Sequence, residues 1–180
     1  MCFIALNVIY VLKDMIIDAI ANSDMVITTG AVSVGKKDIV PKVLEDIGAD
    51  ILFRRANIQP GTPTTASVFQ NKLILSLSGN PYAALANFEL YFWPCLAKMM
   101  HSDTFLPVIE EAVLQNDYDK VNRLRRLIRA YVDKGNVYLP TNTHSSSVIM
   151  NLTKCNCFIE LEPDRRVFVG DTVKVRHFKL

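Results

Sequence analysis

The chain has 180 residues, of which 50% are hydrophobic and 21% are charged. This composition is typical of a globular protein with one or two cores, and it excludes a disordered or fibrous chain. The formal net charge is only +2, and the basic excess is confined to residues 120–134. A dedicated nucleic-acid-binding protein is therefore not expected.

The first residues are apolar, but charged side chains at positions 13, 14 and 18 interrupt them, so we expect no membrane span. No basic segment precedes this stretch, which argues against a secretory signal. The four cysteines lack the spacing of a zinc site or a disulfide framework. Reduced thiols and a cytoplasmic location are the simplest expectation.

The first part of the chain, residues 1–103, alternates helical and extended patterns, which predicts an α/β domain with a mixed sheet. Asn80 is the expected N-cap of the last helix, with Pro81 in its first turn and a kink at Pro94. The expected helices are 11–21, 39–47 and 81–99, and the expected strands are 25–28, 50–58, 64–69 and 73–77, with a turn at 59–63.

The second part, residues 104–180, contains short alternating runs separated by turn residues, which predicts a small all-β domain. Residues 124–131 also fit a helical stripe, but the sequence Asp133–Asn136, with a lysine and a glycine between, is typical of a hairpin turn. The expected strands are 108–114, 123–132, 137–139, 158–161 and 172–177, and strand alternation places Arg123, Arg125 and Arg129 on one face.

Residues 28–38 connect a strand to a helix and combine glycines with hydroxyl side chains, which favours an anion pocket. Gly30, Gly35 and Lys36 match most of the phosphate-loop pattern of nucleoside triphosphatases. Lys37, however, stands where that pattern needs a hydroxyl ligand for magnesium. A plain connecting turn remains an alternative for this loop.

Residues 76–81 form a second candidate loop, because Gly79 permits close backbone approach at the carboxyl end of a strand. Ligands of open α/β sheets bind at that edge. Residues 59–63 are a third candidate. Each of these segments taken alone could be a structural turn.

Residues 24–38, 59–64 and 77–89 together resemble, in order and spacing, the molybdopterin molybdenumtransferase family, which includes bacterial MoeA and the gephyrin E domain. Segments of residues 123–175 resemble the small C-terminal β-domain of that family. The resemblance implies an α/β sandwich followed by an all-β domain. It also implies a fragment that lacks the first strand of the α/β domain and two N-terminal domains.

The resemblance further implies insertion of molybdate into molybdopterin-AMP, with release of AMP, by a homodimer that uses Mg²⁺. By matched position, Asp38 would be catalytic and would hold the metal ion. The residues that would bind the phosphate or pterin, line the cleft or approach the anion from the β-domain are Thr29, Gly30, Ser33, Gly35, Gly79, Asn80, Pro81, Arg125 and Arg129.

Several positions depart from the family pattern. Ala31 replaces a glycine, Lys36 an acidic residue, and Gln59 and Thr62 two lysines, while Asn7 stands near an expected carboxylate. The loss of positive charge predicts weak or absent transferase activity for this chain alone. A non-catalytic, molybdopterin-binding or scaffolding relative of the gephyrin E domain is the alternative, and a phosphate-loop triphosphatase is the third interpretation.

Overall fold

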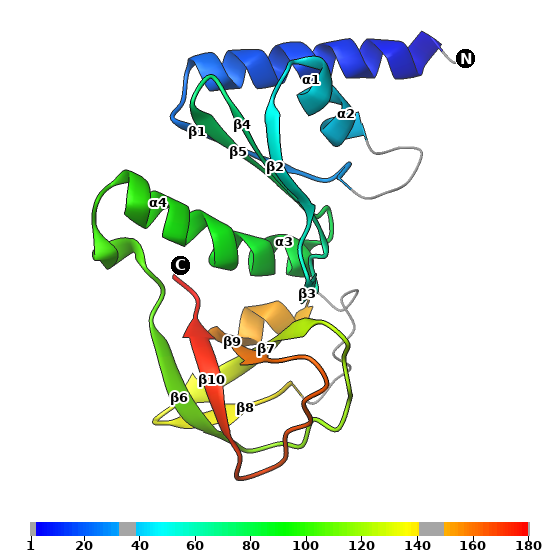
Figure 1. Ribbon diagram of the computed structural model, residues 1–180. Coiled ribbons are helices and arrows are strands. Elements are labelled where there is room, and N and C mark those ends of the chain that lie inside the picture. The colour runs from blue at the N-terminus through cyan, green and yellow to red at the C-terminus, as the bar shows by residue number, and fades with distance from the viewer. Residues whose placement is uncertain (1–2, 33–38, 141–149, 180) are drawn as a thin grey trace. The chain divides into compact units, whose positions relative to one another are not determined.

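The computed structural model describes residues 3–32, 39–140 and 150–179 (Figure 1). Their contacts divide the chain into two compact units. One consists of Met1–Ala56 and Gly61–Gly79, and the other of Asn57–Pro60 and Asn80–Leu180. None of the helices in the described ranges has the length and apolar character needed to cross a membrane.

The first unit is a four-stranded mixed sheet with two helices. Strands follow the order β1-β5-β4-β2, in which β1 is parallel to β5 and the other two pairings are antiparallel. Its elements are α1 (Phe3–Ala21), β1 (Met25–Thr29), α2 (Ile39–Asp46), β2 (Asp50–Arg55), β4 (Pro63–Phe69) and β5 (Lys72–Leu77).

Helices α1 and α2 cover one face of this sheet (Figure 1). Ile16 and Ile20 of α1 and Val43 of α2 pack with Val26 of β1 and Ile74 of β5 in one buried cluster. The spacing of the two isoleucines, i and i+4, puts them on the same side of α1. The amphipathic pattern of the sequence therefore correctly predicted which side of this helix is buried.

The second unit combines a long helical segment with a six-stranded sheet of order β3-β7-β8-β6-β10-β9. An additional pairing of β7 with β9 closes the sheet into a barrel, which leaves no free edge around the ring. Its elements are β3 (Ile58–Gln59), α3 (Pro81–Asn87), α4 (Trp93–Met99), β6 (Ile109–Leu114), β7 (Arg125–Asp133), β8 (Asn136–Tyr138), β9 (Cys157–Leu161) and β10 (Thr172–His177), with short 3₁₀ helices at Asp103–Phe105 and Met150–Lys154.

The barrel core consists of the alternate residues that point inward, such as Leu114, Ile128 and Val175. Strands β7 and β8 form the predicted hairpin, in which Asp133 pairs with Asn136. The two residues between them, Lys134 and Gly135, have φ angles of +46° and +75°, as a tight hairpin turn requires. The prediction of an α/β region followed by an all-β region is confirmed.

Three details of the sequence prediction were wrong. The single strand expected at 50–58 ends at Arg55, after two register shifts against β4, and β3 then pairs with β7 instead. Arg123 precedes β7, so only Arg125 and Arg129 share a strand face. The helix at 81–99 contains a π-helical turn at Phe88–Phe92, directly before α4.

The π-helical turn has a simple cause in Pro94. Proline has no N–H to donate to the preceding turn, and its ring crowds the carbonyl four residues earlier. A widened turn just before the proline relieves both problems without ending the helix. The predicted domain boundary between residues 103 and 104 stays a prediction, since the contacts group 80–103 with the barrel.

Candidate functional site

The first group of predicted site residues lies where the parallel strands β1 and β5 end. Thr29 pairs with Leu77 in the last rung of the two strands. The Gly30 amide then donates a hydrogen bond of 3.0 Å to the Leu77 carbonyl, so the two strands leave the sheet together. Carboxyl ends of neighbouring parallel strands are the usual place for ligands in such sheets.

Gly30 and Gly79, which follow these two strands, touch through their backbones. A Cβ atom on Gly79 would lie 3.1 Å from the Gly30 Cα, and Gly30 itself has φ = +87°. We call this contact the glycine junction. Because neither residue has a side chain, the backbone of both loops is open to close approach by a ligand.

Ala31 occupies the position where the family pattern has a second glycine, and its φ is +53°. A residue with a Cβ is strained in this left-handed region, at a cost of about 1 kcal/mol. The Ala31 carbonyl accepts a hydrogen bond of 3.3 Å from the Val40 amide at the start of α2, which holds this conformation. The departure at this position is therefore tolerated by the backbone.

Asn80 and Pro81 continue the chain from Gly79 into the second unit. The Asn80 side chain caps α3 by accepting a hydrogen bond of 3.1 Å from the Ala83 amide, and Pro81 occupies the first helical turn. The predicted N-cap is confirmed. Its side-chain oxygen is engaged in this cap.

Three of the predicted ligand-binding or metal-binding residues, Ser33, Gly35 and Asp38, lie outside the described residues, as does Lys36. Within the described ranges, no cluster of three or more histidine, cysteine or acidic residues could hold a metal ion. The described residues therefore do not form a magnesium site by themselves.

Arg125 and Arg129, on β7, both have partners inside the second unit. Arg125 forms an ion pair with Glu160 of β9, which also contacts Arg176 at 2.5 Å and Lys174 at 3.3 Å. Burial alone would raise the pKa of Glu160, but Arg176 and Arg125 outweigh it and hold this pKa below its usual value. We call these four residues the Glu160 cluster.

Arg129 is fully buried, and its guanidinium lies 4.5 Å from the centre of the Tyr82 ring. The Tyr82 hydroxyl donates to the Leu127 carbonyl at 2.6 Å and accepts from the Arg129 amide at 3.2 Å. Burial raises the pKa of Tyr82 to about 12, against smaller opposing effects of Arg129. This tyrosine thus ties α3 to β7 as a neutral hydroxyl.

The turn at 59–63 takes part in both units. Gln59 is exposed in β3, where it pairs with Arg126, and the Gln59–Pro60 peptide bond is cis. The Thr62 carbonyl accepts a hydrogen bond of 3.0 Å from the Ala56 amide. The two positions that carry lysine in the family pattern are thus ordered within the described chain.

Glu160 and Tyr82 were not singled out from the sequence. A usable signal was present for Glu160, since a lone acidic residue within the apolar stretch 157–161 needs a cationic partner when buried. Which of the many arginines would pair with it depends on strand register, which the sequence does not display.

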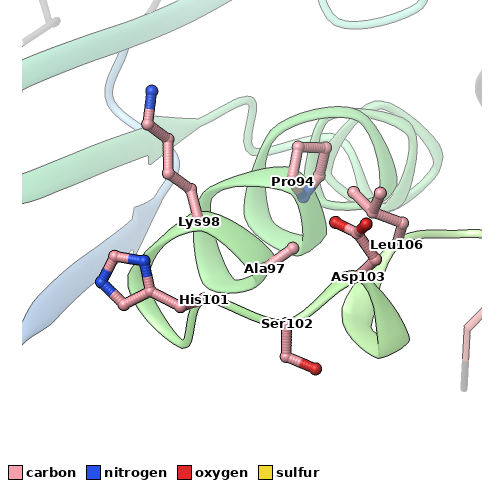
Figure 2. Close-up of a pocket in the computed structure, with 7 residues that line it drawn as sticks. All are labelled: Pro94, Ala97, Lys98, His101, Ser102, Asp103 and Leu106. Atoms are coloured by element: carbon pink, nitrogen blue, oxygen red, sulfur yellow. The ribbon is translucent and has the colours of Figure 1, made fainter.

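A shallow pocket of about 310 Å³ lies at the end of α4 (Figure 2). Figure 2 shows that the side chains of Lys98, His101 and Ser102 point in different directions rather than toward a common centre. None of the predicted site residues lines this pocket. We therefore do not assign it a role.

Two family models match the chain. The "Probable molybdopterin binding domain" matches residues 8–98, and the "MoeA C-terminal region (domain IV)" matches residues 111–178. The chain is also similar to the molybdopterin molybdenumtransferase of Staphylococcus epidermidis, with 37% identity over 161 residues that cover 87% of this chain and 38% of that protein. The Staphylococcus aureus protein of the same name is 33% identical over 162 residues, covering 88% of this chain and 39% of its own length.

Among solved structures, two of the molybdopterin biosynthesis MoeA protein from Pyrococcus horikoshii share this fold. Their TM-scores are 0.71 and 0.78 at 23% identity, and they cover 92% and 94% of this chain and 38% and 41% of theirs. The chain spans about two fifths of the length of the curated relatives it matches. The two family models, in this order along the sequence, show that the chain belongs to the molybdopterin molybdenumtransferase family.

Proposed function

We propose that this chain binds the phosphate and pterin of molybdopterin-AMP at the carboxyl ends of β1 and β5, and that it serves molybdate insertion with release of AMP. The observation that carries this proposal is the glycine junction, where Gly30 and Gly79 meet without side chains at a 3.1 Å approach. The names of the staphylococcal relatives support the reaction class. They do not favour a purely scaffolding role.

In this proposal, the loop after β1 holds the phosphate through Thr29, whose side chain is exposed, and through Gly30. The remaining proposed ligands are the predicted ones: Ser33 and Gly35 for the phosphate or pterin, Asp38 for Mg²⁺ and for orienting water, Gly79, Asn80 and Pro81 for the cleft lining, and Arg125 and Arg129 as cationic groups of the second unit. Arg125 retains about a third of its side-chain exposure, so it can contact a ligand in addition to Glu160.

The proposal extends to the setting of the reaction. Molybdopterin-AMP and molybdate are the proposed substrates, a homodimer is the proposed assembly, and the cytoplasm is the proposed location. The division into domains at 1–103 and 104–180 also remains a proposal. A triphosphatase is disfavoured because Lys37 replaces the hydroxyl ligand that such enzymes need for magnesium.

The test is calorimetric titration of the chain with AMP, molybdopterin-AMP and ATP. We expect Gly79→Ala to weaken binding of the first two at least about tenfold, because displacing a positioning loop by a fraction of an ångström is costly. Gly135→Ala, in the β7–β8 turn, is the matched control, since its added Cβ would meet nothing within 4 Å. Unchanged binding in Gly79→Ala, or Mg²⁺-dependent hydrolysis of ATP, would overturn the proposal.

A second arm of this experiment measures molybdate insertion. We expect weak turnover by the chain alone, and a gain from the Gln59→Lys, Thr62→Lys double variant, because single electrostatic groups commonly change rates by about 10²–10³. Turnover equal to that of an intact relative would contradict the expected weakness, while leaving the binding proposal in place.

A further inference from the structure

A row of hydroxyl side chains crosses three strands of the first unit. Thr28 of β1 pairs with Ser76 of β5, and Ser76 in turn pairs with Thr65 of β4. Residues directly opposite each other on neighbouring strands point to the same face, with Cβ atoms about 5 Å apart. Ser67 lies two residues after Thr65 on β4, so it shares that face. We call these four residues the hydroxyl row.

The hydroxyl row lies on the face that α1 and α2 cover. Val26 and Ile74, each two residues before a member of the row, belong to the buried cluster with Ile16 and Ile20 of α1. Lys72, on the same face of β5, donates a hydrogen bond of 2.7 Å to the Ile20 carbonyl. The row thus continues the helix-covered core toward the carboxyl ends of β1 and β5.

All four hydroxyl oxygens are buried, and within the described part of the chain none has a hydrogen-bond partner. Thr65, Ser67 and Ser76 are completely inaccessible. Buried polar atoms are nearly always paired with protein or with ordered water. Four unpaired hydroxyls on one face would be an unusual concentration of orphaned groups.

The neighbouring Thr64 shows that this strand can satisfy a buried hydroxyl. Thr64 is equally inaccessible but points to the opposite face, where its Oγ1 donates to the Gly61 carbonyl at 2.8 Å. The two adjacent threonines therefore differ in hydrogen bonding and not in burial or residue type.

We propose that the hydroxyl row is an internal hydration site, in which ordered water bridges Thr28, Ser76 and Thr65. A hydroxyl both donates and accepts, as water does, so each water can bond two or three members of the row. No member of the row is charged, and an anion buried among neutral groups alone is strongly disfavoured. Water is the ligand that fits this chemistry, size and degree of enclosure.

The site has a consequence for the loop beside it. Thr28 is two residues before Gly30, so water bonded to Thr28 and Ser76 fixes the ends of β1 and β5 just before the glycine junction. The hydration site needs no bound pterin or nucleotide, and it stands whether or not the proposed function is correct.

The sign of a stability change tests this inference. Thr65→Val and Ser76→Ala remove a hydroxyl and preserve the shape of the side chain. If water bridges the row, each variant strands its neighbours and lowers the melting temperature by about 3–6 °C. If the hydroxyls are orphaned, removing one raises the melting temperature instead, which would overturn the proposal.

Thr64→Val is the matched control, because it removes a hydroxyl whose hydrogen bond is visible and sets the scale of a real loss. In the Thr65→Val, Ser76→Ala double variant, shared water predicts a loss smaller than the sum of the two single losses. Additive gains would contradict it. A high-resolution crystal structure of the unaltered chain should show ordered water within hydrogen-bond distance of Ser76 Oγ, and its absence there would also reject the site.

Discussion

The glycine junction and the Glu160 cluster are both crowded places, but they are built in opposite ways. At the junction, Gly30 and Gly79 approach closely because neither has a side chain. In the cluster, one buried carboxylate faces three cationic side chains and its charge is compensated. The first arrangement fixes the geometry of loops, and the second stabilises the barrel.

This contrast predicts which measurement each region should affect. A change in the cluster leaves buried charge without a partner and should appear mainly in the free energy of unfolding. A change at the junction displaces two loops and should appear mainly in ligand binding. The following three predictions test this division, from the largest expected effect on stability to the smallest.

Glu160→Gln should lower the free energy of unfolding by about 2–4 kcal/mol. The neutral amide keeps the size of the side chain but leaves Arg125 and Arg176 without a compensating charge, which is costly in a buried site. Urea denaturation measures the loss. Glu162→Gln, two residues further and exposed, is the control, and an equal loss in both variants would contradict the role of the cluster.

The Glu160 cluster also has a pH signature. Because the pKa of Glu160 lies below its usual value of 4.5, its ionised form contributes stability that is present above that pH. This contribution is lost as the pH falls through the lower folded-state pKa. Stability should therefore fall less steeply with acidification in Glu160→Gln than in the unaltered chain.

Tyr82→Phe should cost about 1–3 kcal/mol of unfolding free energy. It removes the hydroxyl that joins the Leu127 carbonyl to the Arg129 amide and leaves both backbone groups unpaired. Tyr131→Phe, on the exposed face of β7, should have little effect. If both changes cost the same, the link between α3 and β7 is not stabilising.

Ultraviolet absorbance provides a second measurement of Tyr82. With a pKa of about 12, this tyrosine should remain protonated while exposed tyrosines ionise. Its pKa is raised on folding, so its contribution to stability is complete below pH 10 and is lost as the pH rises toward 12. One tyrosine fewer should therefore titrate in the folded chain than in the unfolded chain before that range.

Gly79→Ala should have the smallest effect on unfolding, about 0.5–1 kcal/mol, since its Cβ would displace the Gly30 backbone by a few tenths of an ångström. Gly30→Ala should cost about as much for a different reason, the strain of a Cβ at φ = +87°. Equilibrium unfolding measures both. A loss from Gly79→Ala as large as that from Glu160→Gln would erase the distinction between the two regions.

The features that local chemistry dictates could be predicted from the sequence. The Asn80 cap, the turn at Lys134 and Gly135 and the inward stripe of α1 each depend on residues a few positions apart. The glycine junction was also within reach, because glycine at the end of a strand has few other uses.

Features that depend on long-range pairing could not be predicted in the same way. Glu160 meets Arg125 across 35 positions of sequence, through the register of β7 against β9. The hydroxyl row likewise exists only because Thr28, Ser76 and Thr65 fall on one rung. In the sequence, these residues are unremarkable members of three separate strands.

Strand β3 has a practical consequence for dissecting this protein. Residues 57–60 leave the first unit to join β7 and then return, so the chain passes between the units three times. No single cleavage point can release either unit with all of its own chain. Expression of residues 104–180 alone would yield a barrel without β3 and α3, and circular permutation or coexpressed fragments would be needed to obtain either unit whole.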